Sequence, residues 1–239
     1  MSQTLTGQTV LVIGRESGIA SAVTRAVRTA GGKVVVAGRD GEKLAKAYAD
    51  DAGVSAETVD LTDEASVAAL AERVGGVDHV VSTASARARG TVGGLDHDTV
   101  LRSFETKVLG PILLAKYFAP TMPKDGSFVF FSGATARKPV IGMLAVAATN
   151  GAVDVVTRSL AVELAPIRVN AVSPGTIDTG AYDALGEDKK AALFDQRAQA
   201  NPARRIGNSE DVADAVLFAL TNTFVTGISI GVDGGEPLV

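Results

Sequence analysis

The sequence predicts an α/β fold in which helices cover both faces of a mostly parallel sheet of about seven strands. Three observations support this: short runs rich in β-branched residues recur along the chain, helical patterns separate them, and several runs are apolar almost without alternation. Runs such as Val10–Ile13 and Val34–Val36 suit strands covered on both faces. Strict alternation of strand and helix implies right-handed crossovers. No low-complexity linker interrupts the pattern, so we expect one doubly wound domain over residues 1–239.

The elements follow one another in regular order. Strands are expected at residues 9–13, 33–37, 56–59, 78–82, 127–131, 167–172 and 228–232. Amphipathic or Ala-rich helices are expected at residues 18–30, 41–51, 63–74, 96–119, 143–164, 187–200 and 209–220. Thr62, followed by acidic residues, is expected to cap the third helix. Pro111 cannot donate a hydrogen bond to the preceding turn, so it should bend the fourth helix.

The composition is that of a soluble globular protein and excludes several kinds of site. Hydrophobic residues make up 46% and charged residues 21% of 239 residues, which argues against a disordered or fibrous chain. A net charge of −4 argues against non-specific binding to nucleic acid. The absence of cysteine excludes disulfides and thiolate chemistry, and two histidines, His79 and His97, leave little for a metal site. We expect His79, within a strand, to be packed or exposed rather than catalytic, and His97 to cap or flank the fourth helix.

No segment of the sequence suggests a membrane protein. Residues 1–6 are polar and contain no apolar signal core. The longest apolar stretch, Val140–Ala148, is too short to span a bilayer. We expect a cytoplasmic protein.

A glycine turn follows the first strand directly and leads into a helix. Residues 14–20 read Gly-Arg-Glu-Ser-Gly-Ile-Ala. Glycines allow the backbone to approach phosphates, and a helix N-terminus offers free N–H groups and a positive dipole. The turn therefore indicates a dinucleotide site at Gly14, Ser17, Gly18 and Ile19, although a tight β–α connection would explain it too.

Residues at the next strand end point to the kind of dinucleotide. Arg39 follows the second strand, where an adenosine ribose would lie, and Arg15 in the glycine turn could reach the same position. A cation there accommodates a 2′-phosphate, whereas an acid would accept from the 2′-hydroxyl, so we expect NADP(H) rather than NAD(H). Asp60, after the third strand, could accept from the adenine amino group, cap a helix, or do both.

At this point the chain resembles the short-chain dehydrogenase/reductase family over nearly its whole length. The resemblance rests on the glycine turn, on Asp60-Leu61-Thr62, on residues 80–85 (Val-Val-Ser-Thr-Ala-Ser), on residues 168–179 (Arg-Val-Asn-Ala-Val-Ser-Pro-Gly-Thr-Ile-Asp-Thr) and on the terminal Asp-Gly-Gly at 233–235. It implies a Rossmann-type sheet and a cofactor held partly by Ile177, through its backbone, and by Thr179. The full expected cofactor set is Gly14, Arg15, Ser17, Gly18, Ile19, Arg39, Asp60, Leu61, Ser82, Thr83, Ala84, Pro174, Gly175, Ile177 and Thr179.

The chain departs from the family where the family's proton chemistry takes place. Family members use a tyrosine as general acid/base and a lysine four residues later, which lie on one helical face. Alignment puts Val146 and Asn150 at these two positions. The three tyrosines, Tyr48, Tyr117 and Tyr182, are followed four residues later by Ala, Thr and Gly, so no Tyr-x-x-x-Lys occurs in the sequence.

Two further positions of the family's catalytic set also differ. Gly133 stands where the resemblance places a catalytic serine, with Ser132 before it, and Lys107 stands in the place of an asparagine. Losing a positioned general acid costs about 10²–10⁴-fold in rate. Lys107 is the best replacement acid because a partly desolvated ammonium has a lowered pKa, while Ser132 and Asn150 could hydrogen-bond the substrate. A surface or intersubunit ion pair of Lys107, for example with Glu105 or Glu163, is the other interpretation.

Three functions are consistent with these departures. The chain could be an NADP(H) oxidoreductase acting on a small molecule, either with a rearranged acid or on a substrate that needs little acid help, such as an iminium, a quinone or a conjugated alkene. It could instead bind NADP(H) as a sensor or inactive subunit. It could also catalyse a non-redox reaction in the same pocket.

The substrate pocket is expected around Gly133, Val146 and Tyr182. Tyr182 lies in the segment after residue 180 where the family has its substrate lid, although it could also simply pack the short helix there. Arg87 and Arg89 could attract an anionic substrate or lie in a solvated loop. The fourth and fifth expected long helices carry small residues that permit close packing, and the resemblance implies a homodimer or homotetramer through them.

Overall fold

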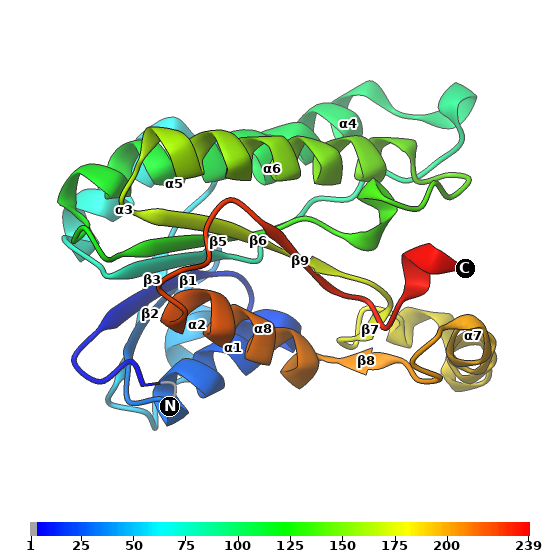
Figure 1. Ribbon diagram of the computed structural model, residues 1–239, viewed down its shortest axis with the longest axis horizontal. Helices are drawn as coiled ribbons and strands as arrows, with labels where there is room; N and C mark the ends of the chain where they lie inside the picture. Colours follow the sequence, from blue (N-terminus) through cyan, green and yellow to red (C-terminus); the bar gives the residue numbers. More distant parts are fainter. Residues whose placement is uncertain (1–3) are drawn as a thin grey trace.

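Seven parallel strands form one sheet in the order β3-β2-β1-β4-β5-β6-β9, which confirms the predicted fold class (Figure 1). The structure is a computed structural model and describes residues 4–239, so Met1 to Gln3 of the polar start lie outside the described residues. The strands of the sheet are β1 (Thr9–Ile13), β2 (Lys33–Gly38), β3 (Val54–Thr58), β4 (His79–Ser82), β5 (Ser127–Phe131), β6 (Arg168–Pro174) and β9 (Ser229–Val232). Two additional strands, β7 (Ile177–Asp178) and β8 (Gly207–Asn208), pair with each other and were not predicted, because two residues are too few to show a pattern.

Helices cover both faces of the sheet. In Figure 1, α3, α4, α5 and α6 lie over one face and α1, α2 and α8 under the other, while α7 lies at the end of the molecule where the chain terminates. Their bounds are α1 (Gly18–Thr29), α2 (Gly41–Ala47), α3 (Glu64–Val74), α4 (His97–Phe104), α5 (Gly110–Phe118), α6 (Leu144–Glu163), α7 (Glu187–Ala200) and α8 (Ser209–Thr221). Helix α2 ends four residues before the predicted boundary. There the Asp51 side chain accepts from the Gly53 N–H at 2.9 Å and leads the chain into β3.

Two apolar layers explain why the central strands are apolar at every position. Successive side chains of a strand point to opposite faces. In β1, Val10 and Val12 pack in the layer shared with α1 and α8, whereas Leu11 and Ile13 pack in the layer shared with α3, α5 and α6. All four are at most 2% exposed. The strand is buried on both sides, as its unbroken apolar run predicts.

Two local predictions need correction. The cap of α3 is Asp63, whose side chain accepts from the Ala65 N–H at 3.0 Å, and not Thr62. The Thr62 hydroxyl instead donates to Asp60 Oδ1 at 2.8 Å, which takes it away from the helix end. The predicted bend at Pro111 takes the form of a π-helical turn over Glu105–Leu109, and Pro111 sits in the first turn of α5, where its missing N–H costs nothing.

The Arg-Val-Asn segment that supports the family resemblance has a structural role here. Arg168 is 6% exposed and donates to the carbonyl oxygens of Ala219 and Leu220, at 2.6 and 2.7 Å, at the end of α8. Asn170 donates to the Val225 carbonyl oxygen at 2.9 Å. Arg168 thus satisfies carbonyl groups that the end of α8 leaves unpaired, and Asn170 satisfies one in the loop that leads to β9.

The histidines lie where the sequence suggests. His79 is 1% exposed in β4, with Nδ1 2.8 Å from Ser127 Oγ, and burial followed by the nearby charge of Arg168 lowers its pKa to about 4. His97 begins α4 and is exposed. Within residues 4–239, no helix is long and apolar enough to cross a membrane, and no cluster of three or more metal-ligating side chains occurs.

Candidate functional site

The candidate site lies at the carboxyl edge of the sheet between β1 and β4, where the strand order reverses. The chain first adds β2 and β3 on one side of β1 and then returns to place β4 on the other. Thr83, just after β4, ties the two strand ends together, because its backbone N–H and its hydroxyl both donate to the Ile13 carbonyl oxygen at 2.9 Å. Ligands of open α/β sheets bind in the crevice at such a reversal.

The glycine turn leaves no room for side chains on its inner side. A Cβ on Gly14 would lie 2.5 Å from the Ala20 Cβ and would also collide with Thr83 Oγ1. A Cβ on Gly38, at the end of β2, would lie 2.6 Å from the Gly14 carbonyl oxygen. Gly18 has a φ of +62°, in the left-handed region that favours glycine. The turn can therefore be this tight only with glycine at these positions.

The start of α1 is open to an anion. Ser17 is the N-cap residue and makes no side-chain hydrogen bond to the helix, so the first N–H groups of α1 lack a side-chain cap. Arg15 and Arg39 are exposed on either side of the turn, and neither forms an ion pair with another described residue. Together they place positive charge around a helix N-terminus.

Asp60 stands close to this positive charge. Its Oδ1 accepts from the Thr62 N–H at 2.9 Å and from the Thr62 hydroxyl at 2.8 Å. These bonds, with smaller contributions from Arg39 and Arg102, lower the pKa of the Asp60 carboxyl. The side chain is thus an anion, and its second oxygen is available as an acceptor. Its neighbour Leu61 is buried and packs near Gly110.

The later cofactor residues gather on the same crevice. A Cβ on Gly18 would lie 3.3 Å from Thr179 Cβ, which shows that the chain after β6 reaches the glycine turn. Ser82 is 3% exposed and Ile177 is 6% exposed. Of the predicted cofactor set, residues from the first, third, fourth and sixth strand ends therefore converge on one edge. The set is Gly14, Arg15, Ser17, Gly18, Ile19, Arg39, Asp60, Leu61, Ser82, Thr83, Ala84, Pro174, Gly175, Ile177 and Thr179.

Lys107 is buried, and the surface ion-pair interpretation is wrong. It lies in the π-helical turn at 7% exposure, and its Nζ donates to the Ser132 carbonyl oxygen at 3.2 Å. Burial, and then repulsion by Arg87, lowers the pKa of Lys107 to about 7, against a smaller opposing effect of Asp154. An amine with such a pKa exists in both protonation states near neutrality and can give or take a proton.

Ser132, Gly133 and Asn150 interlock between β5 and α6. The Ser132 hydroxyl donates to the Asn150 carbonyl oxygen at 3.0 Å, so its proton is not offered to a ligand in this arrangement. Asn150 Nδ2 donates to Thr135 Oγ1 at 2.7 Å. A Cβ on Gly133 would lie 2.6 Å from Asn150 Nδ2. The amide of Asn150 thus fills the space next to Gly133, and a side chain at position 133 would need it to move.

Asn150 also keeps one atom available. Its Oδ1 is buried and has no hydrogen-bond partner among the described residues. A buried acceptor left unpaired costs free energy unless a water or ligand meets it. Val146, one turn earlier on α6, is buried at 6% exposure, so the phenol position of the family is occupied by an inert side chain.

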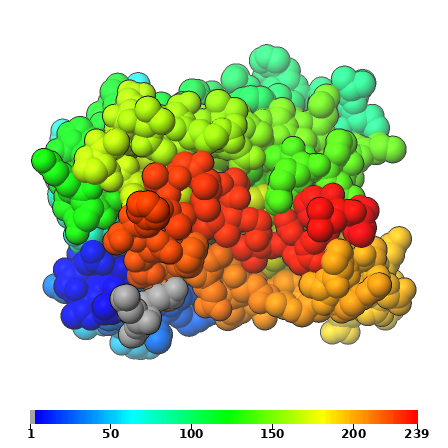
Figure 2. Space-filling view, in the orientation of Figure 1, coloured from blue at the N-terminus to red at the C-terminus, as the bar shows by residue number. Residues whose placement is uncertain are grey.

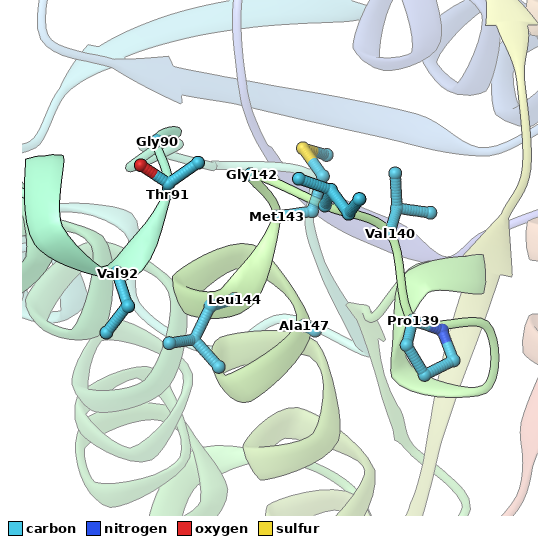
Figure 3. Close-up of a pocket in the computed structure, with 10 residues that line it drawn as sticks. Gly90, Thr91, Val92, Pro139, Val140, Gly142, Met143, Leu144 and Ala147 are labelled. Atoms are coloured by element: carbon cyan, nitrogen blue, oxygen red, sulfur yellow. The ribbon is translucent and has the colours of Figure 1, made fainter.

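An apolar cleft lies at the start of α6 and was not predicted as part of the site. Its volume is about 270 Å³, and it opens between the loop after β4 and the segment that leads into α6 (Figure 3). Its lining residues are Gly90, Thr91, Val92, Pro139, Val140, Ile141, Gly142, Met143, Leu144 and Ala147. The signal was present in the sequence, because the apolar stretch from Val140 to Ala148 is long and mostly faces this cleft rather than the core. Ile141 is 93% exposed.

Tyr182 packs near helix α7, in the segment that the family resemblance predicts to be a substrate lid. Its ring meets Phe194 of α7 edge-on, with centroids 5.3 Å apart. Electrostatic contact with Tyr182 opposes the effects of burial and of Arg89, which lower the pKa of Arg87. Arg87 also repels the Lys107 ammonium, an electrostatic interaction that the sequence could not show.

Comparisons with known proteins agree with this geometry. A family model described as enoyl-(acyl carrier protein) reductase matches residues 13–236. The chain is 34% identical over 248 residues to short-chain dehydrogenase/reductase ATR9 of Stachybotrys chlorohalonatus (strain IBT 40285), covering 97% of this chain and 98% of that protein. It is 36% identical over 228 residues to a protein of Xanthobacter autotrophicus (strain ATCC BAA-1158 / Py2) named inactive 2-(S)-hydroxypropyl-CoM dehydrogenase 2, covering 89% and 98%.

A solved structure is similar in both fold and sequence. It is the crystal structure of a small-chain dehydrogenase in complex with NADPH, with a TM-score of 0.84 and 32% identity. The match covers 97% of this chain and 99% of that one.

Proposed function

The chain belongs to the short-chain dehydrogenase/reductase family, and on that premise we propose that it transfers a hydride between NADP(H) and a small organic substrate, with Lys107 in place of the usual Tyr/Lys proton relay. The observation that carries the proposal is the buried Lys107 amine, whose pKa is lowered to about 7. The NADPH complex of the structural relative supports the cofactor.

The glycine turn and its cations fit a dinucleotide with a 2′-phosphate. Glycine at position 14 keeps the turn tight, because a Cβ there would collide with Thr83 Oγ1 and the Ala20 Cβ, and the uncapped N–H groups of α1 can donate to a diphosphate. Arg15 and Arg39, without ion-pair partners among the described residues, suit the additional phosphate. Bound NADPH supplies the hydride.

Lys107 would complete a reduction by moving one proton. As the hydride adds to a carbonyl carbon, the carbonyl oxygen gains negative charge, and the Lys107 ammonium gives it a proton and becomes a neutral amine. A donor with a pKa near the working pH serves this step well. The Ser132 carbonyl oxygen holds the ammonium in place at 3.2 Å, and Asn150 Oδ1 is an acceptor that can orient a substrate donor.

The apolar cleft indicates the substrate's character. Its walls, which include Val92, Met143 and Leu144, would take an apolar part of the substrate rather than a sugar-like one. The proposed substrate pocket also includes Gly133, Val146 and Tyr182. A substrate that needs little acid help, such as a quinone, is compatible with the same walls.

Two measurements test this function. Calorimetry should show NADPH binding more tightly than NADH; equal affinities would remove the assignment of Arg15 and Arg39. With a panel of apolar carbonyl and quinone acceptors, Lys107→Met should lower carbonyl reduction by about 10²-fold or more while leaving NADPH affinity in place. Unchanged turnover in Lys107→Met would eliminate Lys107 as the acid.

A second function is supported by a particular observation. The relative from Xanthobacter is named inactive, and this sequence lacks any Tyr-x-x-x-Lys. An NADP(H)-binding sensor or inactive subunit would bind NADPH and oxidise it with none of the acceptors. Product formed without change at the nicotinamide would instead indicate the non-redox alternative.

Assembly and location complete the proposal. We propose a homodimer or homotetramer in the cytoplasm, with contacts through α4, α5 and α6. Leu101 on α4, Leu109 in the π-helical turn between α4 and α5, and Val155 and Val162 on α6 are 48 to 81% exposed, which suits a covered face. Light scattering that gives the mass of a single chain would contradict it.

A further inference from the structure

The lid helix α7 is attached to the rest of the molecule largely through ion pairs. None of its side chains is buried in the described structure. Near its start, Lys190 pairs with Asp178 at 3.0 Å and with Asp183 at 2.7 Å. Near its end, Arg197 Nη1 pairs with Glu236 Oε1 at 2.8 Å. Elements with few buried apolar contacts open at low free-energy cost, so these pairs decide where α7 lies.

The same Glu236 carboxylate also holds the loop that leads to Ile177. Its Oε2 accepts from the Thr176 N–H at 2.7 Å and from the Thr176 hydroxyl at 3.0 Å. A Cβ on Gly175 would lie 2.8 Å from this oxygen, so the close approach depends on glycine at position 175. The Glu236 side chain is 15% exposed. Hydrogen bonds to an ionised, partly buried carboxylate are stronger than those between neutral groups.

Glu236 stands on a turn that is itself fixed. Asp233 Oδ2 pairs with Arg137 at 2.6 Å, and Lys138 donates to the Glu236 carbonyl oxygen at 3.1 Å. The Ala203 N–H donates to the Gly234 carbonyl oxygen at 2.9 Å. Figure 2 shows this red C-terminal segment lying directly against the orange residues of the α7 region. These contacts hold the turn that carries Glu236 in place, although it lies near the end of the chain.

We propose that Glu236 is a positioning residue that couples the lid helix α7 to the loop Pro174–Ile177, so that the placement of α7 and the affinity for NADP(H) depend on each other. One planar carboxylate binds both partners, so a shift that breaks the Arg197 contact also strains the bonds to Thr176. Such a coupling is reciprocal: a dinucleotide that orders Ile177 also holds α7 in place. The affinity part of this inference rests on the proposed NADP(H) function, whereas the coupling between the two segments does not.

The test compares four variants. Glu236→Gln removes the negative charge that binds both Arg197 and Thr176. Arg197→Gln removes only the ion pair with α7, and Arg197→Lys keeps the positive charge. Arg25→Gln is the matched control, because Arg25 forms an ion pair of the same 2.8 Å length with Glu210, on α1 and α8, away from the lid. The first readout is hydrogen exchange of the Thr176 amide and of α7 in the protein without nucleotide. The second is NADPH affinity by calorimetry, with KM and kcat for an accepted substrate.

We expect faster exchange of both α7 and the Thr176 amide in Arg197→Gln as well as in Glu236→Gln, with Arg197→Lys and Arg25→Gln close to the original protein. NADPH should slow exchange in α7 of the original protein but not in Arg197→Gln. KM should rise about two- to fivefold in Arg197→Gln with kcat little changed, and NADPH affinity should fall about tenfold in Glu236→Gln.

Unchanged exchange in Arg197→Gln and Glu236→Gln would overturn the proposal, and so would equal effects in Arg25→Gln. If the original protein binds no NADPH, the proposed function fails, and the exchange without nucleotide still decides the coupling. If Glu236→Gln does not fold, Arg197→Gln carries the test, because the Arg197 side chain is 41% exposed and its loss is tolerable.

Discussion

Two turns on the same edge of the sheet have opposite characters. The turn from β1 to α1 is open: glycines clear its inner side, the helix N-terminus has no side-chain cap, and Arg15 and Arg39 have no ion-pair partners among the described residues. The passage from β5 to α6 is closed, since the Ser132 hydroxyl bonds to α6 and the Asn150 amide fills the space beside Gly133. Binding of a dinucleotide and transfer of a proton are thus separable parts of one fold, and this sequence contains the glycine turn but no Tyr-x-x-x-Lys.

The largest expected effect comes from filling the open turn. In Gly14→Val, the new side chain would collide with Thr83 Oγ1 and with the Ala20 Cβ, so the turn that leads to the start of α1 would have to shift. We expect NADPH binding to fall by about a hundredfold or more, measured by calorimetry. Gly93→Ala is the control, because a Cβ there meets nothing within 4 Å. Binding that survives in Gly14→Val would place the dinucleotide elsewhere.

Removing one cation should give a smaller and more selective effect. In Arg39→Gln, a charge-assisted contact to the 2′-phosphate is lost, so NADPH affinity should fall about tenfold while NADH affinity stays the same. Calorimetry with both nucleotides measures the difference, and Arg25→Gln controls for the loss of a surface charge. An equal fall for both nucleotides would mean that Arg39 contacts a group they share.

The closed passage can be tested by adding one methyl group. In Gly133→Ala, the new Cβ would lie 2.6 Å from Asn150 Nδ2, and overpacking of this kind costs about 1–3 kcal/mol. Because the φ of Gly133 is 172°, in the extended region, backbone strain does not contribute. Adding Asn150→Ala should recover part of the loss, since it removes the colliding amide. Urea unfolding of the two single variants and the double variant measures this coupling.

The control for this pair lies on the same helix. A Cβ on Gly151 meets nothing within 4 Å, so Gly151→Ala should leave stability unchanged or raise it by up to about 1 kcal/mol. Additive losses in Gly133→Ala and Asn150→Ala would show that the two residues do not share the space, and the closed passage would need another explanation.

The sequence alone predicted the open turn better than the closed one. Gly14, Gly18 and Arg39 are close to strand ends along the chain, so strand order and spacing were enough to bring them together. A partly desolvated Lys107 was one of the two predicted alternatives, but the π-helical turn in which it lies and its contact with the Ser132 carbonyl oxygen could not be predicted, because they depend on the packing of distant segments. The contact between Glu236 and Thr176 joins residues 60 positions apart, and no periodicity indicates such a pairing.

The apolar cleft shows a different limit. The stretch from Val140 to Ala148 was read from its length alone, as too short for a membrane. Only the fold shows that Pro139 to Leu144 pass along the surface before α6 begins, which leaves apolar side chains beside the loop after β4. Hydropathy gives the amount of apolar surface, whereas topology decides whether it faces the core or a ligand.

The last prediction concerns how the free energy of unfolding changes with pH because of Lys107. Its pKa is about 7 in the folded protein and 10.5 in the reference state, so between these values the unfolded chain binds more protons. The free energy of unfolding should therefore rise with pH across this window, by at most about 1.4 kcal/mol per pH unit, and the buried ammonium should weaken the fold below pH 7. Lys107→Met should lack this slope and should be more stable than the original protein near pH 7. Urea unfolding of both proteins at pH 7, 8 and 9 gives the comparison. If the free energy of unfolding changes with pH in the same way in both proteins, Lys107 is hydrated in solution. The region around the passage from β5 to α6 would then lack the proposed acid as well as the family's tyrosine.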